Sequence, residues 1–171
     1  MPTLGVSFRP ATIEDAGGLF EVHQASVRGL CSSAYSAEHI EAWFAGRSPA
    51  MYGPALEAGH IWVAEGQTGI VGFVGAEPGE VTLLFVLPEA SGKGLGRRLF
   101  EHGLCVASAA FDGPLTVIAT KNSEAFYQRH GFESVEEQAF VRGSAELHYP
   151  VVRMLRPSGD FRHHAMAKTD A

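Results

Sequence analysis

The chain has 171 residues, of which 46% are hydrophobic and 19% are charged, and its formal net charge at pH 7 is −6. This length and composition predict one soluble globular domain with a sizeable core, and no apolar run approaches the roughly eighteen residues of a membrane span. The acidic balance argues against a general nucleic-acid-binding protein, and the start of the sequence lacks the basic and apolar blocks of a signal peptide.

Apolar periodicity, capping residues and the positions of Gly and Pro divide the chain into strands and helices. In chain order the sequence predicts a strand over 6–10, helices over 13–30 and 36–44, a loop over 46–59, strands over 60–65, 69–75 and 81–87, a helix over 95–110, a strand over 115–119, a short helix over 123–130, and strands over 132–140 and 146–155. The polar tail from residue 158 shows no periodicity, so we expect it to be mobile.

Three residues of the N-terminal helices carry local signals. Thr12 and Asp15 have the spacing of a capping box at the start of the first helix. His23 lies on the apolar face of that helix, where it is either a hydrogen-bonded core histidine or a group near a bound substrate. The region 46–59 is rich in Gly, Pro and Ala, which predicts a loop with at most one irregular turn.

Few residues suit a metal site. Cys31 and Cys105 lack the spacing of metal ligands and are too few for a disulfide framework. His163 and His164 are adjacent but isolated from other ligand types. We therefore expect no metal, and reduced thiols in a cytoplasmic protein.

The strongest functional signal is the junction between the predicted strand over 81–87 and the helix that follows it. The strand is an apolar, β-branched run, typical of a strand buried on both faces, and Pro88 ends it because proline cannot donate to a strand ladder. Three spaced glycines then permit positive φ and a close approach of the backbone to a ligand: Gly92, Gly94 and Gly96.

A strand, a glycine-rich turn and a helix start in this order form an anion site, and phosphate is its usual occupant. Cationic side chains add to the positive potential of the turn: Lys93, Arg97 and Arg98. A dinucleotide fingerprint would need a glycine at position 97, and a Walker A loop would need Ser or Thr directly after Lys93. A glycine-rich connection without a ligand is the remaining alternative.

The sequence from Val86 to Leu99, Val-x-Pro-x-x-Ser-Gly-Lys-Gly-Leu-Gly-x-x-Leu, resembles the acyl-CoA pyrophosphate loop of the GNAT superfamily of N-acetyltransferases. Ser91 departs from the Gln or Arg that this family usually carries there. Downstream, the segment 126–132, Phe-Tyr-Gln-Arg-His-Gly-Phe, resembles the Tyr-x-x-x-Gly-Phe segment of the same family. The resemblance covers roughly residues 5–156.

The resemblance implies an α+β (mixed α/β) fold, with a GNAT-like central mixed, mostly antiparallel sheet and helices on both faces. The predicted order of elements fits such a sheet. We expect a single domain over 1–157, followed by the tail over 158–171. Two adjacent parallel strands are expected to splay beside the phosphate loop and to expose main-chain donors.

Acetyl-CoA is the co-substrate that the resemblance implies. Main-chain N–H groups from Ser91 to Arg97 would bind its diphosphate, and its pantetheine arm would pair with residues 85–87 like an added strand. Carried over onto this sequence, the expected binding residues are Phe85, Val86, Leu87, Ser91, Gly92, Lys93, Gly94, Leu95, Gly96, Arg97, Asn122 and Tyr127.

Tyr127 is the candidate general acid, because the family places a tyrosine near the CoA sulfur at this point; the alternative is a tyrosine that only packs. Glu80 is the candidate base for the acceptor amine, and the alternative is a solvated residue of the preceding turn. The N–H of Val86 or a neighbour would hold the thioester carbonyl. The reserve bases are His23, His148 and Tyr149.

The sequence therefore predicts a cytoplasmic N-acetyltransferase that moves acetyl from acetyl-CoA directly to a primary amine of a small molecule or peptide. A non-catalytic acyl-CoA-binding regulatory or sensor module on the same scaffold is the alternative, and a nucleotide-binding protein is a third class. The segment 35–59 would cover the acceptor cleft but carries no motif that identifies the acceptor. We expect no nucleic-acid or membrane partner, and a monomer or homodimer.

Overall fold

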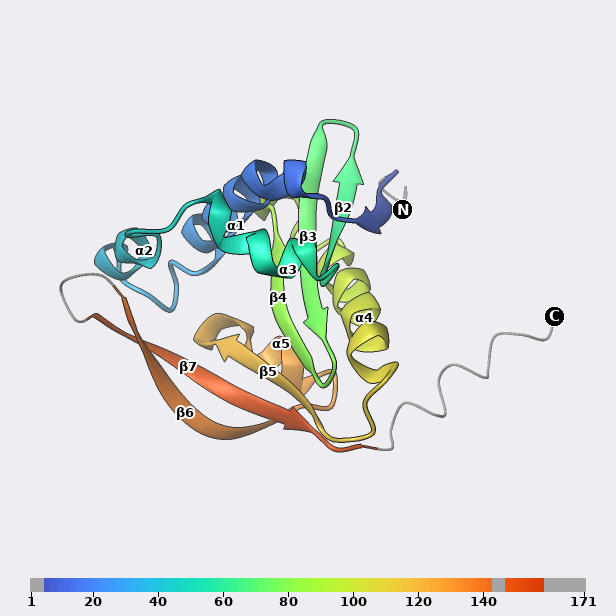
Figure 1. Ribbon diagram of the computed structural model, residues 1–171. Coiled ribbons are helices and arrows are strands. Elements are labelled where there is room, and N and C mark those ends of the chain that lie inside the picture. The colour runs from blue at the N-terminus through green and yellow to red at the C-terminus, as the bar shows by residue number, and fades with distance from the viewer. Residues whose placement is uncertain (1–4, 143–146, 159–171) are drawn as a thin grey trace.

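The computed structural model describes residues 5–142 and 147–158, and Figure 1 shows its course. In chain order its helices and strands are β1 (Ser7–Pro10), α1 (Ala16–Leu30), α2 (Ala37–Trp43), α3 (Gly53–Glu57), β2 (Ile61–Gly66), β3 (Gly69–Glu77), β4 (Glu80–Val86), α4 (Leu95–Ser108), β5 (Leu115–Thr120), α5 (Glu124–Gln128), β6 (Glu133–Arg142) and β7 (Leu147–Arg156). The predicted order is confirmed, with α3 as an additional short helix. The tail beyond residue 158, with His163 and His164, lies outside the described residues.

The seven strands form one sheet in the order β1-β2-β3-β4-β5-β7-β6. Neighbouring strands are antiparallel except for β4 and β5, which are parallel. The chain passes from β4 to β5 through α4, which is the long crossover that a parallel pair requires. The predicted α+β fold with a mixed, mostly antiparallel sheet is confirmed.

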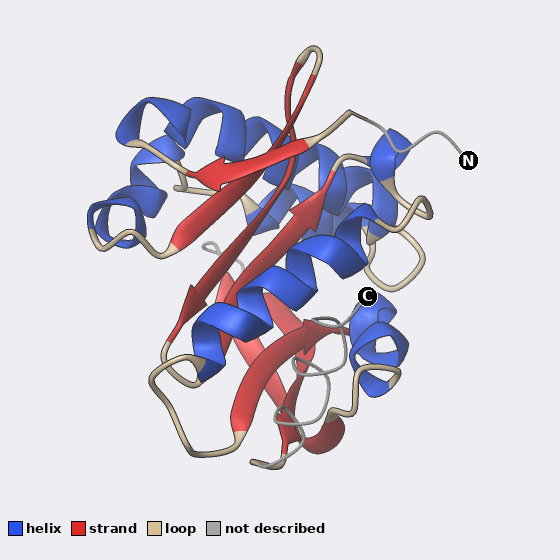
Figure 2. Cartoon of the chain, turned by 90° about the vertical axis from the view of Figure 1, so that its right-hand side faces the viewer, coloured by secondary structure: helices blue, strands red, loops and turns tan. Residues whose placement is uncertain are grey.

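Helices cover both faces of this sheet. Successive side chains of β3 point to opposite faces, so that Val74 packs with α4 and α5 whereas Phe73 packs with α1 and α3. Gly103 lets α4 lie close to the sheet, because a Cβ at this position would be 2.7 Å from a methyl carbon of Val74. In Figure 2, α4 crosses in front of the sheet. No helix among the described residues is long and apolar enough to cross a membrane.

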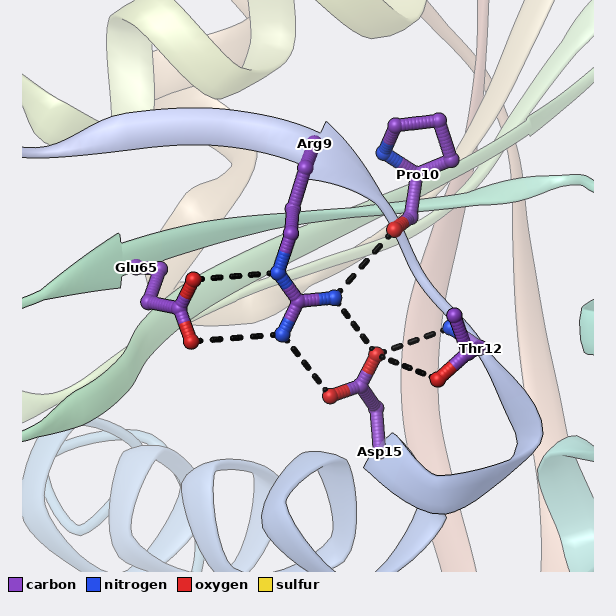
Figure 3. Close-up of polar contacts among 5 residues, drawn as sticks. All are labelled: Arg9, Pro10, Thr12, Asp15 and Glu65. Carbon is purple, nitrogen blue, oxygen red and sulfur yellow. Dashed lines mark hydrogen bonds and ion pairs between the residues drawn. The ribbon is translucent and has the colours of Figure 1, made fainter.

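Arg9 of β1 joins the first strand to β2 and to the start of the first helical segment (Figure 3). Its guanidinium donates to the Glu65 carboxylate at 3.0 and 3.3 Å and to the Asp15 carboxylate at 2.8 and 3.0 Å. Asp15 also accepts from the N–H of Thr12 at 2.8 Å, as the predicted capping box requires. The hydrogen bonds from Arg9 are the main cause that lowers the pKa of both carboxyl groups below their usual values.

The region 46–59 contains short helical turns where the sequence predicted mainly a loop. Pro49 begins a 3-10 turn and Pro54 lies in the first turn of α3, where the missing N–H of proline costs nothing. Tyr52, between them, is only 1% exposed and packs against α1. These turns are too short to show apolar periodicity in the sequence.

Candidate functional site

Strands β4 and β5 separate in the middle of the sheet. The two strands pair at two positions, Glu80 with Thr116 and Val81 with Val117. Beyond them, β4 continues to Val86 and β5 to Thr120 without further pairing. A β-bulge at Thr82, where the register between β3 and β4 shifts, accompanies the separation. Figure 1 shows the two strands diverging from their shared end. The predicted splay is confirmed, and it opens a gap between the strands.

The gap exposes main-chain groups of β4. Leu87 donates its N–H to the carbonyl of Val71 on β3 at 2.9 Å. Because hydrogen-bonded and non-bonded positions alternate along an antiparallel pair, Phe85 also directs its N–H toward β3, and the Val86 N–H faces the gap. Of the three residues predicted to pair with the pantetheine arm, Val86 is therefore the one whose N–H is oriented toward the gap.

A pocket of about 490 Å³ lies beside the gap, between α1, β4, the glycine-rich loop and α5. The predicted binding residues that line it are Phe85, Val86, Ser91, Gly92, Gly94, Gly96, Arg97, Asn122 and Tyr127. Three other predicted residues do not line it. Leu95 is buried in the core and Leu87 packs partly against it, whereas Lys93 is exposed to solvent.

The glycine-rich loop owes its shape to two glycines rather than three. Gly92 has a φ of 71° and Gly94 a φ of 83°, and no atom lies within 4 Å of a Cβ built on either. Gly96 has no positive φ, because it already lies in the first turn of α4. The N–H of Ser91 donates to two carbonyls of the preceding turn at 3.1 Å, so it is not one of the free donors that the sequence predicted.

The start of α4 supplies the remaining donors. The Gly94 carbonyl accepts from the N–H of Arg98 at 3.1 Å, and the N–H groups of the preceding helical residues have no acceptor within the helix. They lie at the positive end of the helix dipole. Arg97 lines the pocket and pairs with Glu101 at 2.8 Å, whereas the guanidinium of Arg98 lies 4.9 Å from the ring centre of Phe8. The predicted contribution of Arg98 to the loop is therefore not observed.

Tyr127 lines the same pocket from α5. Its ring is buried against Phe100, with the ring centres 5.2 Å apart, and its carbonyl accepts from His130 and Phe132 N–H groups at 2.9 and 3.2 Å. The helix ends at Gln128, earlier than the predicted end at Gly131, and Gly131, with a φ of 83° in the turn that follows, permits this return of the chain. Burial raises the pKa of the Tyr127 hydroxyl above its usual value, so the phenol keeps its proton at neutral pH.

A second pocket, of about 300 Å³, opens on the other side of the gap. Ile118 and Thr120 line both pockets, which therefore meet at the end of β5. Glu80 lines the second pocket, and burial together with the nearby Glu77 carboxylate raises its pKa above the usual value. A raised pKa suits a carboxylate that accepts a proton near neutral pH. The two predicted catalytic side chains, Tyr127 and Glu80, thus line adjoining pockets.

His23 belongs to the wall of the second pocket and to a buried hydrogen-bond network. The Trp43 indole N–H donates to its Nε2 at 3.2 Å, so Nδ1 carries the proton and donates to the Tyr52 hydroxyl at 2.8 Å. Burial is the main cause that lowers the pKa of His23 to about 3. The predicted core histidine is confirmed, and since both ring nitrogens are engaged, a role as base is not supported.

Of the other reserve residues, Tyr149 is less suited to proton transfer. The Tyr149 hydroxyl donates to the carbonyl of His39 at 2.6 Å, and only the main chain of His148, paired with Val141, is described. Asn122 lines the first pocket, but its amide donates to the Leu30 carbonyl at 3.2 Å.

Several lining residues come from segments without any motif. In the first pocket these include Ser26, Leu30 and Cys31, and in the second Trp43, Arg47 and Met51. No spacing in the sequence marks them, because the fold alone brings them to the gap. Among the residues that the structure describes, no group of three or more His, Cys, Asp or Glu side chains is placed to hold a metal ion.

Residues 31–152 match the family profile described as an acetyltransferase (GNAT) domain. Peptidyl-lysine N-acetyltransferase YjaB of Salmonella typhimurium is 27% identical over 163 residues, which cover 89% of this chain and 99% of that protein. The uncharacterized N-acetyltransferase YafP of Escherichia coli K12 is 29% identical over 113 residues, covering 66% of this chain and 71% of YafP.

Two solved structures share the fold. A GCN5-related N-acetyltransferase from Rhodopseudomonas palustris aligns with a TM-score of 0.83 at 25% identity, covering 92% of this chain and 98% of that one. The PaiA N-acetyltransferase of Thermoplasma acidophilum, solved in complex with coenzyme A, aligns with a TM-score of 0.67 at 20% identity, covering 90% and 99%.

Proposed function

The chain belongs to the GNAT superfamily of N-acetyltransferases and is an acyltransferase, and on this premise we propose that it moves an acetyl group from acetyl-CoA directly to a primary amine. The observation that carries the proposal is the gap between β4 and β5. A pocket beside a glycine-rich helix start and a second pocket that contains Glu80 adjoin at this gap. Such an arrangement suits two substrates that must meet.

We assign acetyl-CoA to the first pocket. The N–H groups at the start of α4 would bind the diphosphate, helped by the positive end of the helix dipole. The main chain of Val86, which faces the gap, would pair with the pantetheine arm and donate its N–H to the thioester carbonyl. The amine would enter from the second pocket.

The reaction then follows from the groups on each side. Glu80, directly or through water, accepts a proton from the incoming ammonium, because only the neutral amine has a free electron pair. The amine nitrogen bonds to the thioester carbon, and the Val86 N–H stabilises the charge that develops on the carbonyl oxygen. The C–S bond breaks as the intermediate collapses, and Tyr127 gives its proton to the departing thiolate. The nitrogen loses its remaining extra proton, through water, to the Tyr127 phenolate, which restores the phenol, and Glu80 releases the proton of the ammonium to solvent. The products are an N-acetylated amine and free CoA.

Replacement of Tyr127 by Phe tests the assignment of the acid. The change removes only the hydroxyl, so we expect kcat to fall by about 10²-fold or more, while the Kd for acetyl-CoA and the unfolding temperature stay close to wild type. Release of free thiol with a panel of amines measures the rate, and calorimetric titration measures binding. An unchanged kcat would show that another group protonates the thiolate.

The same assay distinguishes the alternative, a module that binds acyl-CoA without turnover. Binding of acetyl-CoA with no thiol release on any amine would favour that module and refute the enzyme mechanism. The name of the Salmonella relative makes a peptidyl lysine one candidate acceptor for the panel.

A further inference from the structure

The second pocket contains a carboxylate and a guanidinium among aromatic and apolar walls. Glu80 and Arg47 line it together with Trp43 and Tyr149. They are its two charged side chains among the described residues, since His23 is neutral. Its volume of about 300 Å³ lies at the lower end of the roughly 300–1,000 Å³ that small-molecule sites occupy. The pocket is therefore suited to a small acceptor rather than to a broad protein surface.

The aromatic wall is fixed before any ligand binds. The indole N–H of Trp43 is held by His23, which is held in turn by Tyr52. Tyr149 meets Trp43 edge to face, with ring centres 5.2 Å apart at 86°, and its hydroxyl is engaged with the main chain. A pre-formed apolar wall favours an acceptor with an apolar or aromatic body, because no side chain has to be ordered on binding.

The guanidinium of Arg47 lies near this wall. Its positive charge contributes to the lowered pKa of His23 and opposes the rise that burial causes in the pKa of Tyr52. A second cation brought into the pocket would meet the charge of Arg47, whereas an anion would be attracted to it. The carboxylate of Glu80, the first residue of β4, would instead attract an ammonium group.

We infer that the acceptor is a small zwitterion, an amino acid whose amine is directed to Glu80 and whose carboxylate binds Arg47. This inference rests on the proposed function and adds the class of acceptor to it. The carboxylate would form charge-assisted hydrogen bonds with the guanidinium, and an apolar side chain would contact Trp43 and Tyr149. A polyamine would place a cation beside Arg47, and a lysine side chain of a protein brings no carboxylate to it.

Acceptors that differ in the carboxylate alone test the inference. Thiol release is measured with phenylalanine, phenylalaninamide, phenethylamine, spermidine and a lysine-containing peptide, and each rate is expressed per neutral amine. We expect kcat/KM for phenylalanine to exceed that for phenylalaninamide by roughly 10- to 100-fold, the value of a hydrogen bond between charged groups. Spermidine and the peptide should be poorer still.

Two arginine variants locate the carboxylate. Arg47→Gln should reduce the preference for phenylalanine over phenylalaninamide to near unity. Arg47→Glu should make spermidine a better acceptor than phenylalanine. Arg28→Gln is the matched control, since Arg28 is exposed on α1 and pairs with Glu41 at 3.5 Å, outside both pockets. It should keep the wild-type preference. Acetyl-CoA affinity and unfolding temperature show that each variant is folded.

The outcomes separate the inference from the proposed function. If wild-type protein acetylates phenylalaninamide or the lysine peptide as fast as phenylalanine, the zwitterionic acceptor is refuted while acetyl transfer to an amine stands. A wild-type preference that persists in Arg47→Gln would also refute the role of Arg47. If no amine releases thiol from acetyl-CoA, both the proposed function and the inference fail.

Discussion

Replacement of Gly94 by alanine tests the glycine-rich loop most directly. Gly94 has a φ of 83°, and no atom lies within 4 Å of a Cβ built on it. Alanine therefore meets no steric clash, and the change perturbs the backbone conformation alone. An L-residue in the left-handed region costs roughly 1–2 kcal/mol.

This strain energy can lower either the stability of the protein or its affinity for CoA. If the loop keeps its shape, the free energy of unfolding falls by that amount and binding is unchanged. If the loop relaxes to a negative φ, the N–H groups at the start of α4 turn away, and the ligand must restore the shape on binding. Gly94 is exposed and its surroundings are open, so packing does not oppose the relaxation. We therefore expect the Kd for CoA to rise about 5- to 30-fold.

Calorimetric titration with CoA measures the change, and thermal unfolding is recorded alongside it. Gly59→Ala is the matched control, because Gly59 has a φ of 70°, equally open surroundings, and a position outside both pockets. The control should lose stability and keep wild-type affinity. Wild-type affinity for CoA in Gly94→Ala without a loss of stability would refute the assignment of the diphosphate to this loop, because the loop would then have relaxed without any effect on binding.

Two further predictions concern proton transfer and stability. Glu80→Gln should lower kcat/KM most where the amine is protonated, so the ratio of wild-type to variant rate should grow by up to about tenfold per pH unit from about pH 9 to about pH 7; a ratio independent of pH would exclude Glu80 as the base. His23 has its pKa lowered to about 3 by burial, whereas an unfolded histidine titrates near 6.5. Its contribution to stability is complete above about pH 6.5 and falls as the pH drops toward about 3, by up to about 1.4 kcal/mol per pH unit. His23→Gln should lose that part of the slope in urea unfolding between about pH 7 and about pH 5, and an unaltered slope would assign it to other groups.

The local features that the sequence predicted are those for which the backbone conformation of one or two residues is decisive. Pro88 lies two residues after the end of β4 and begins a 3-10 turn, and Gly131, with a φ of 83°, lies three residues after the end of α5. Gly92 and Gly94 adopt the positive φ that their spacing indicated. In each case the requirement is local, so a single residue type reveals it without knowledge of the fold.

The second pocket could not be predicted in this way. The resemblance placed segment 35–59, with Trp43 and Arg47, and Glu80 at the acceptor cleft, but no residue type or spacing marks these residues and Tyr149 as neighbours. The Ser91 N–H, expected to be free, is used by the preceding turn. His23 was open to two interpretations, and it is a bonded core residue that also lines a pocket. The pocket and the environment of His23 depend on tertiary packing, which a linear pattern does not contain, whereas the bonds of the Ser91 N–H belong to a local turn that the glycine spacing did not reveal.

The short ladder between β4 and β5 has a mechanical consequence. This ladder joins the part of the sheet formed by β1 to β4 to the part formed by β5, β7 and β6, and it consists of two residue pairs. A molecule lying along Val86 would supply the main-chain hydrogen bonds that β5 does not make with this part of β4. The sheet would then be continuous only in the complex with acetyl-CoA, and release of CoA would leave the gap between β4 and β5 open again.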